Sequence, residues 1–137
     1  MTPGELPFRS SLHHVGLIFP DAERLKGVAT LLGLTLGEPY YVERYQAQCH
    51  FTTAPSGSAI EFVIPGGGKL AEFNKGMGGL HHVALQVEDL AAASAALRAQ
   101  GVDLLEEEPV EAGALRINFV PPAWTWGVIV ELVEVGG

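Results

Sequence analysis

Two histidine doublets and two isolated glutamates are the residues of this chain that could bind a metal ion. The doublets open the similar apolar runs "SLHHVGLIF" (11–19) and "GLHHVALQV" (79–87). Glu61 and Glu131 interrupt two further apolar runs, "AIEFVIP" and "VIVELVEV". Imidazole nitrogens and carboxylate oxygens together suit divalent Co, Ni, Mn, Zn or Fe. Taken singly, the histidines could instead be hydrogen-bonded strand residues and the glutamates solvated carboxylates. Only their arrangement can favour a metal site over this alternative.

The chain repeats one order of sequence signals, and that order indicates which elements position these residues. Each half has an alternating strand, a helix opened by Asp and closed by Gly, then a Pro and further strand-like runs. The helices are expected after the N-caps Asp21 and Asp89, ending near Gly33 and Gly101. The later strands are expected in "YQAQCHFTT", "SAIEFVIP", "ALRINFVPP" and "WGVIVELVEV". We therefore predict one α+β domain, residues 1–137, of two βαβββ modules (12–66 and 80–135) joined by a Gly-rich linker (67–79).

Strand alternation separates the two members of each doublet, because successive side chains point to opposite faces of a sheet. His14 and His82 lie opposite the bulkier apolar residues of their strands, and each is followed two positions later by a small residue, Gly16 or Ala84. Glu61 and Glu131 also lie opposite their apolar faces, where a carboxylate is costly to bury unless it is paired or bound to a cation.

The histidines and glutamates also occupy equivalent places in the repeat. His14 precedes Glu61 by 47 positions, and His82 precedes Glu131 by 49. Pseudo-symmetry then predicts that His14, Glu61, His82 and Glu131 bind one divalent ion, with two positions of an octahedral shell left open.

These motifs resemble the vicinal oxygen chelate superfamily, the glyoxalase, bleomycin-resistance and extradiol-dioxygenase group, over about residues 12–134. The segments "GGLHHVALQVEDLAAASAALRAQGVDLLEEEP" and "GVIVELVE" are most similar to its methylmalonyl-CoA epimerase branch. The resemblance implies an open, cup-shaped mixed sheet around a metal site held by the same four residues. It also implies a homodimer, and proton abstraction beside a metal-held carbonyl of a small carbonyl or thioester substrate.

The catalytic base is the part of the resemblance that departs from the epimerase branch. The Glu of that branch, about seven residues before the aromatic of the third strand, corresponds here to Arg44 if Phe51 is that aromatic. The candidate bases are therefore Glu131, as a metal ligand that detaches, with His50 and Glu43 as substitutes.

Substrate-binding candidates come from both halves of the chain. We expect Leu115, Ile117 and Phe119 to form the core face of their strand, which would leave Arg116 and Asn118 facing the cup. An arginine at such a position could receive a carboxylate or phosphate with two hydrogen bonds. The further candidates are Gln48, Arg44 and Trp124.

Composition narrows the class of protein. The formal charge of −8 disfavours nucleic acid as a partner, and a single cysteine excludes an internal disulfide. No apolar run approaches the roughly 20 residues of a membrane span, and the N-terminus has no signal-peptide pattern, so a cytoplasmic protein is expected.

The function predicted is a metal-dependent isomerase similar to methylmalonyl-CoA epimerase. The alternatives are a glyoxalase I-like lactoylglutathione lyase, another lyase or a dioxygenase of the superfamily, and a non-catalytic resistance protein that binds small molecules.

Overall fold

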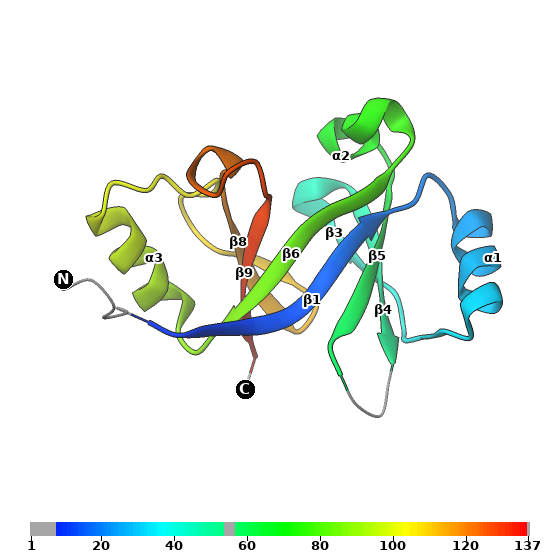
Figure 1. Ribbon diagram of the computed structural model, residues 1–137, viewed down its shortest axis with the longest axis horizontal. Coiled ribbons are helices and arrows are strands. Elements are labelled where there is room, and N and C mark those ends of the chain that lie inside the picture. Colours follow the sequence, from blue (N-terminus) through cyan, green and yellow to red (C-terminus); the bar gives the residue numbers. More distant parts are fainter. Residues whose placement is uncertain (1–7, 54–56, 137) are drawn as a thin grey trace. The chain divides into compact units, whose positions relative to one another are not determined.

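The structure, a computed structural model, describes residues 8–53 and 57–136 (Figure 1). Residues 1–7, which belong to the N-terminal segment expected to lack a signal peptide, lie outside the described part. The elements in chain order are β1 (Ser10–Ile18), α1 (Ala22–Leu32), β2 (Thr35–Leu36), β3 (Tyr40–Val42), η1 (Glu43–Tyr45), β4 (Ala47–Thr53), β5 (Ala59–Pro65), α2 (Gly68–Glu72), η2 (Phe73–Gly76), β6 (Gly79–Val87), α3 (Leu90–Ala99), β7 (Val110–Ala112), β8 (Leu115–Val120), η3 (Pro122–Trp124) and β9 (Val130–Val135). The strands pair both in parallel and in antiparallel and are accompanied by a few helices, which confirms the predicted α+β class.

Both main helices begin at the predicted N-caps. The Asp21 carboxylate accepts a hydrogen bond from the Arg24 backbone N–H at 2.8 Å, and Asp89 accepts one from that of Ala92 at 3.0 Å. Each bond satisfies one of the backbone donors that a helix start leaves without a partner. Helix α1 ends at Gly33, whose φ of 69° is a left-handed conformation that favours glycine.

The chain folds as two compact units, one of residues 14–82 and the other of residues 1–13 with 83–137. Strands β1 and β6 each contribute residues to both units, because the boundaries fall inside these strands. The linker expected at 67–79 lies in the unit of residues 14–82 and contains α2 and η2. Among the described residues, no helix combines the length and hydrophobicity that crossing a membrane requires.

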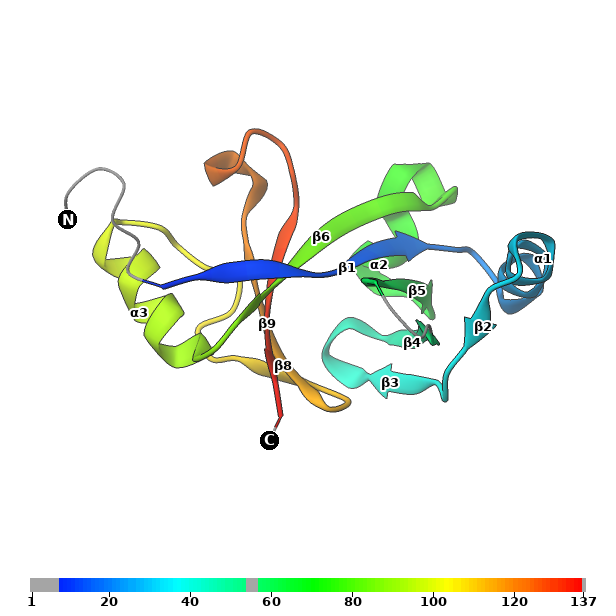
Figure 2. The same cartoon turned by 60° about the horizontal axis from the view of Figure 1, so that its bottom comes forward.

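In the unit of residues 14–82 the strand order is β2-β4-β5-β1, and β3 also pairs with β4, along residues 47–49, next to the β2 pairing at residues 52 and 53 (Figure 2). β1 and β5 run parallel, with Gly16 opposite Glu61, whereas β4 and β5 run antiparallel, with Phe51 opposite Glu61. Residues directly opposite each other in paired strands point to the same face of a sheet. Gly16, Phe51 and Glu61 therefore share one face, and His14, two positions before Gly16, shares it too.

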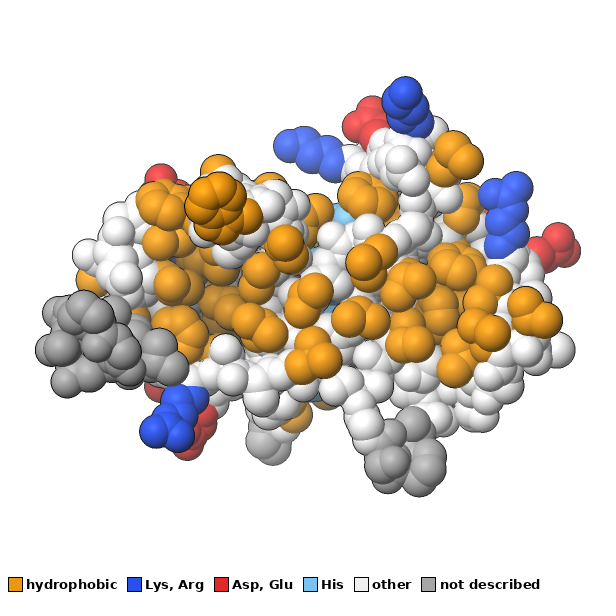
Figure 3. Space-filling view, in the orientation of Figure 1, with side chains coloured by type: hydrophobic (Ala, Val, Ile, Leu, Met, Phe, Trp, Pro, Cys, Tyr) orange, Lys and Arg blue, Asp and Glu red, His pale blue; other side chains and the backbone are white. Residues whose placement is uncertain are grey.

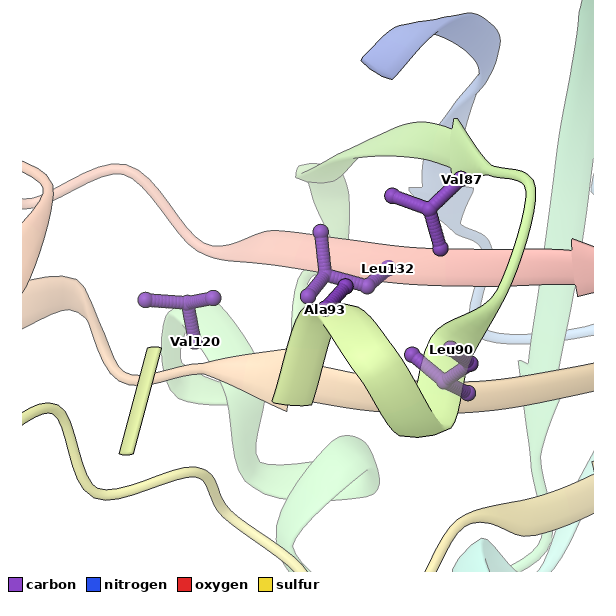
Figure 4. Packing of buried hydrophobic residues seen from close by; sticks show 5 residues of the cluster. All are labelled: Val87, Leu90, Ala93, Val120 and Leu132. Atoms are coloured by element: carbon purple, nitrogen blue, oxygen red, sulfur yellow. The ribbon is translucent and has the colours of Figure 1, made fainter. Parts of the chain in front are cut away.

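In the unit of residues 1–13 and 83–137 the order is β6-β9-β8-β7. Helix α3 packs its Leu90 and Ala93 against Val87, Val120 and Leu132 of three of these strands (Figure 4). Removing such side chains from water supplies the main stabilisation of this unit, at roughly 1.5–3 kcal/mol for each large aliphatic side chain.

Candidate metal centre

Three side chains of types that can bind a metal meet inside the unit of residues 14–82. The Nε2 atoms of His14 and His82 lie 3.2 Å apart, and Oε1 of Glu61 lies 3.4 Å from the first and 3.3 Å from the second. All three side chains are buried, with exposures of 0% for His14 and 5% for each of the others. A buried carboxylate and two buried imidazoles at such short separations form a compact donor set.

The separations of these donors fit a single divalent ion. A point equidistant from three atoms spaced 3.2–3.4 Å apart can lie about 2 Å from each, and metal–nitrogen and metal–oxygen bonds in such sites are about 2.0–2.2 Å long. Nitrogen and carboxylate-oxygen donors are also the ligands of first-row divalent metals. The side chains present therefore fit a metal ion.

A glycine makes the room for the second histidine. A Cβ atom at Gly16 would lie only 2.0 Å from Cε1 of His82 and 2.4 Å from its Nε2. Real non-bonded carbon atoms stay about 3.5–4.0 Å apart. The small residue two positions after His14, noted in the sequence, is thus required for the His82 ring to occupy its place.

The electrostatics of the cluster favour the ionised form of Glu61. Burial by itself raises the pKa of a carboxyl group, but the hydrogen bonds and charges of His14 and His82 outweigh it and hold the pKa of Glu61 well below its usual range. Glu61 is therefore an anion, the form that binds a cation.

Neighbouring residues hold the three candidate ligands in place. The Tyr40 hydroxyl donates to Oε2 of Glu61 at 2.7 Å, and the Phe51 ring meets the His14 ring edge to face at 4.9 Å. Nδ1 of His82 lies 2.9 Å from Nδ1 of His81, whose ring packs against Phe73. From the sequence, Tyr40 could be taken only as a residue that walls the pocket or covers core, because nothing in the sequence shows that the three-residue β3 pairs with β4.

Glu131 belongs to the other unit and occupies the equivalent place in it. It lies opposite Ala84 in the parallel β6–β9 pair, as Glu61 lies opposite Gly16 in the parallel β1–β5 pair. Glu131 is 4% exposed, so all four predicted ligands are buried residues of types that bind metals.

The candidate residues in and just before β4 do not face the cluster of His14, Glu61 and His82. His50 lies opposite Phe62 in the β4–β5 pair, so it points to the other face from Glu61, and Gln48 shares that other face. Burial lowers the pKa of His50. Glu43 and Arg44 are exposed in η1, before β4 begins. The expectation that His50 and Gln48 reach the site is therefore corrected by the strand register.

The prediction for β8 assigned its two faces the wrong way round. Phe119 lies opposite Glu131, whereas Asn118 and Val120 lie opposite Leu132 and Val130 on the face that packs against α3. The Asn118 amide is buried, accepts from the Glu106 N–H and donates to the Glu106 carbonyl, so it pins the loop before β7. Both faces of this strand are largely buried, and apolar alternation therefore could not show which one faces the helix.

Arg116 and Trp124 are also placed differently from the expectation of substrate contact. The exposed Arg116 pairs with Glu111 on the adjacent strand at 2.8 Å, which raises the pKa of Arg116. Trp124 is half exposed in η3. Neither placement shows an anion-binding site.

Comparison with known proteins gives a consistent set of relatives. Residues 13–120 match the sequence model of the Glyoxalase/Bleomycin resistance protein/Dioxygenase superfamily. An ethylmalonyl-CoA/methylmalonyl-CoA epimerase of Cereibacter sphaeroides is 30% identical over 131 residues, covering 90% of this chain and 97% of the relative. The mitochondrial methylmalonyl-CoA epimerase of Bos taurus is 29% identical over 129 residues, covering 90% of this chain and 73% of the relative.

Solved structures agree with the sequence relatives. The crystal structure of methylmalonyl-CoA epimerase from Mycobacterium tuberculosis superposes with a TM-score of 0.84 at 30% identity, covering 92% of this chain and 88% of that one. A further methylmalonyl-CoA epimerase structure gives a TM-score of 0.80 at 29% identity. This chain belongs to the glyoxalase, bleomycin resistance protein and dioxygenase superfamily, and its relatives there include methylmalonyl-CoA epimerases.

Proposed function

We propose that this protein is a divalent-metal-dependent epimerase that removes and returns a proton on a carbon beside a carbonyl group, with a methylmalonyl-CoA-like thioester as its substrate. The observation that carries the proposal is the set of three converging donors on His14, Glu61 and His82, in a chain whose relatives are methylmalonyl-CoA epimerases.

Glu131 is proposed as the fourth ligand. Its register opposite Ala84 repeats that of Glu61 opposite Gly16, and His82 lies two positions before Ala84 just as His14 lies two before Gly16. Two carboxylates also balance the charge of a divalent ion, and the histidines contribute as neutral imidazoles.

When bound, a divalent ion at this site supplies Lewis-acid stabilisation of negative charge on a carbonyl oxygen. The remaining chemistry belongs to the chain. Glu61 is not the proposed base, because its Oε1 faces the two histidine nitrogens and its Oε2 accepts a hydrogen bond from the Tyr40 hydroxyl. Glu131 is proposed as the base: one carboxylate oxygen takes the proton from carbon and passes it to water, and a proton from water is returned to the opposite face of that carbon, which inverts the centre. Glu43 stays an alternative base, whereas the strand register argues against His50.

The binding of coenzyme A itself finds little support in the surface charge. The chain has only eight lysines and arginines. Those visible on the face shown in Figure 3 do not form one basic patch. We propose recognition of the acyl thioester end of the substrate, at the proposed metal centre.

A cytoplasmic location and a homodimer remain proposals from the sequence, and the dimer can be checked by light scattering.

Solvent deuterium exchange tests the proposal. Metal-loaded protein is incubated with methylmalonyl-CoA in deuterium oxide, and the substrate mass is followed against a His82→Ala control. The proposal predicts a gain of one mass unit with the wild-type protein and none with the control. If the metal-loaded wild-type protein gives no exchange, the epimerase proposal fails, and glyoxalase-type or other lyase chemistry on the same scaffold takes its place.

A further inference from the structure

The two oxygens of Glu61 have different partners. Oε1 lies 3.4 Å and 3.3 Å from the two histidine Nε2 atoms, whereas Oε2 accepts a 2.7 Å hydrogen bond from the Tyr40 hydroxyl. We propose that Tyr40 is a positioning residue that keeps Glu61 a single-oxygen metal ligand and so preserves an open coordination position for the substrate. This inference rests on the metal centre of the proposed function.

The strand order brings Tyr40 to Glu61 across an intervening strand. Tyr40 on β3 lies opposite Cys49 on β4, and Phe51, two positions further along β4 on the same face, lies opposite Glu61 on β5. The Tyr40 ring stacks on the Phe51 ring, with centroids 5.9 Å apart and an angle of 21° between the planes. Phe51 thus packs against the Tyr40 ring and supports it in the position from which its hydroxyl reaches the Glu61 carboxylate.

The same phenylalanine also touches a histidine ligand. The Phe51 ring meets the His14 ring edge to face, with centroids 4.9 Å apart and planes at 81°. Tyr40, Phe51 and His14 therefore form a continuous packed row beside Glu61. A side chain held by such packing keeps its rotamer, which is what a positioning residue needs.

The hydrogen bond limits how Glu61 can bind an ion. A carboxylate can bind a metal through one oxygen or through both. Because Oε2 is held by the tyrosine hydroxyl, Glu61 offers Oε1 alone toward the histidines. Binding through both oxygens would turn Oε2 away from this part-buried hydrogen bond and fill a position otherwise available to water or substrate.

The test compares Tyr40→Phe with Tyr41→Phe in the full chain. Phenylalanine keeps the ring and its stacking and removes only the hydroxyl. Tyr41 is the matched control, because it follows on the same strand, faces the other way and is 61% exposed. Manganese(II) binding is measured by electron paramagnetic resonance, and coordinated water by the relaxation rate of solvent protons. Melting of the metal-free proteins checks that each variant folds.

Tyr40→Phe is expected to weaken manganese binding about tenfold. This is the lower end of the roughly 10–100-fold loss of metal affinity seen when a ligand loses its hydrogen-bond partner. If two positions of an octahedral shell hold water in the wild-type protein, the variant should lose about half of the coordinated-water relaxation as the second carboxylate oxygen takes one of them. Tyr41→Phe should match the wild-type protein in both measurements.

The outcomes separate this inference from the metal site itself. If folded Tyr40→Phe keeps the wild-type count of coordinated water, the proposal that Tyr40 limits Glu61 to one metal-binding oxygen is wrong, whatever the affinity of the variant for manganese. If the wild-type protein binds no manganese, the metal centre of the proposed function fails, and the role of Tyr40 fails with it.

Discussion

Replacement of Gly16 by alanine is the smallest change that should eliminate the metal site. The added methyl group would lie 2.0 Å from Cε1 of His82, 2.4 Å from its Nε2 and 2.5 Å from its Nδ1. Since non-bonded carbons need about 3.5 Å or more, the imidazole must retreat by roughly 1.5 Å. A metal site tolerates displacements of only about 0.2 Å in its ligand distances. His82 therefore cannot bind an ion together with His14 and Glu61 in the variant.

The size of the effect follows from losing a ligand and crowding a packed sheet. Loss of a direct ligand should weaken binding by more than the roughly 10–100-fold that losing a hydrogen-bond partner of a ligand costs. Overpacking of a well-packed interior should lower the free energy of unfolding of the metal-free protein by about 1–3 kcal/mol.

Metal content after dialysis against cobalt(II), measured by plasma mass spectrometry, gives the stoichiometry, and chemical unfolding in chelator gives the stability. Gly27→Ala is the matched control. Gly27 lies exposed in α1 with no atom within 4 Å of an added Cβ, so this variant should keep its metal and gain about 0.5–1 kcal/mol from helix propensity. A Gly16→Ala protein that keeps one ion per chain at wild-type affinity would refute the placement of His82 beside Gly16.

Three further predictions concern the surroundings of the ligands. His81→Ala should weaken metal binding about 10–100-fold, because Nδ1 of His82 loses its 2.9 Å partner; unchanged affinity in a chelator competition would contradict this. His50→Ala should leave the affinity unchanged, since His50 lies on the other face of β4, and a large loss would restore it as a site residue. In metal-free protein, the lowered pKa of Glu61 means that its ionised form adds stability above the ordinary carboxyl pKa of about 4.3, and that this stability is lost on acidification. The stability advantage over Glu61→Gln should therefore shrink as the pH falls below about 4, and an advantage that grows there would have the wrong sign.

The parts of the site carried by long strands and by the repeat could be predicted from the sequence. Alternation along nine-residue strands placed His14 and His82 opposite the bulkier apolar side chains. Gly16 was noted as a small residue beside His14, but the structure shows that it makes room for the other histidine, His82. Asp21 and Asp89 were recognisable as caps because a side-chain oxygen three residues before a backbone N–H needs no tertiary information.

What could not be predicted depends on which strands pair and on which face a helix covers. The contact between Tyr40 and Glu61 requires the order β3-β4-β5, and β3 is only three residues long. In β8 the residues on both faces are largely buried, so the sequence pattern favoured Leu115, Ile117 and Phe119 as the core face, whereas Val120 packs against α3. His50 was misplaced because the parity of β4 is set by its register with β5, with Phe51 opposite Glu61.

The most direct test of the metal centre is an anomalous diffraction experiment on crystals grown with cobalt(II). The structure predicts one anomalous peak about 2.0–2.2 Å from Nε2 of His14, Nε2 of His82 and Oε1 of Glu61. Crystals of the cobalt-loaded protein with no peak among these three atoms, or with the only peak elsewhere on the chain, would contradict the assignment.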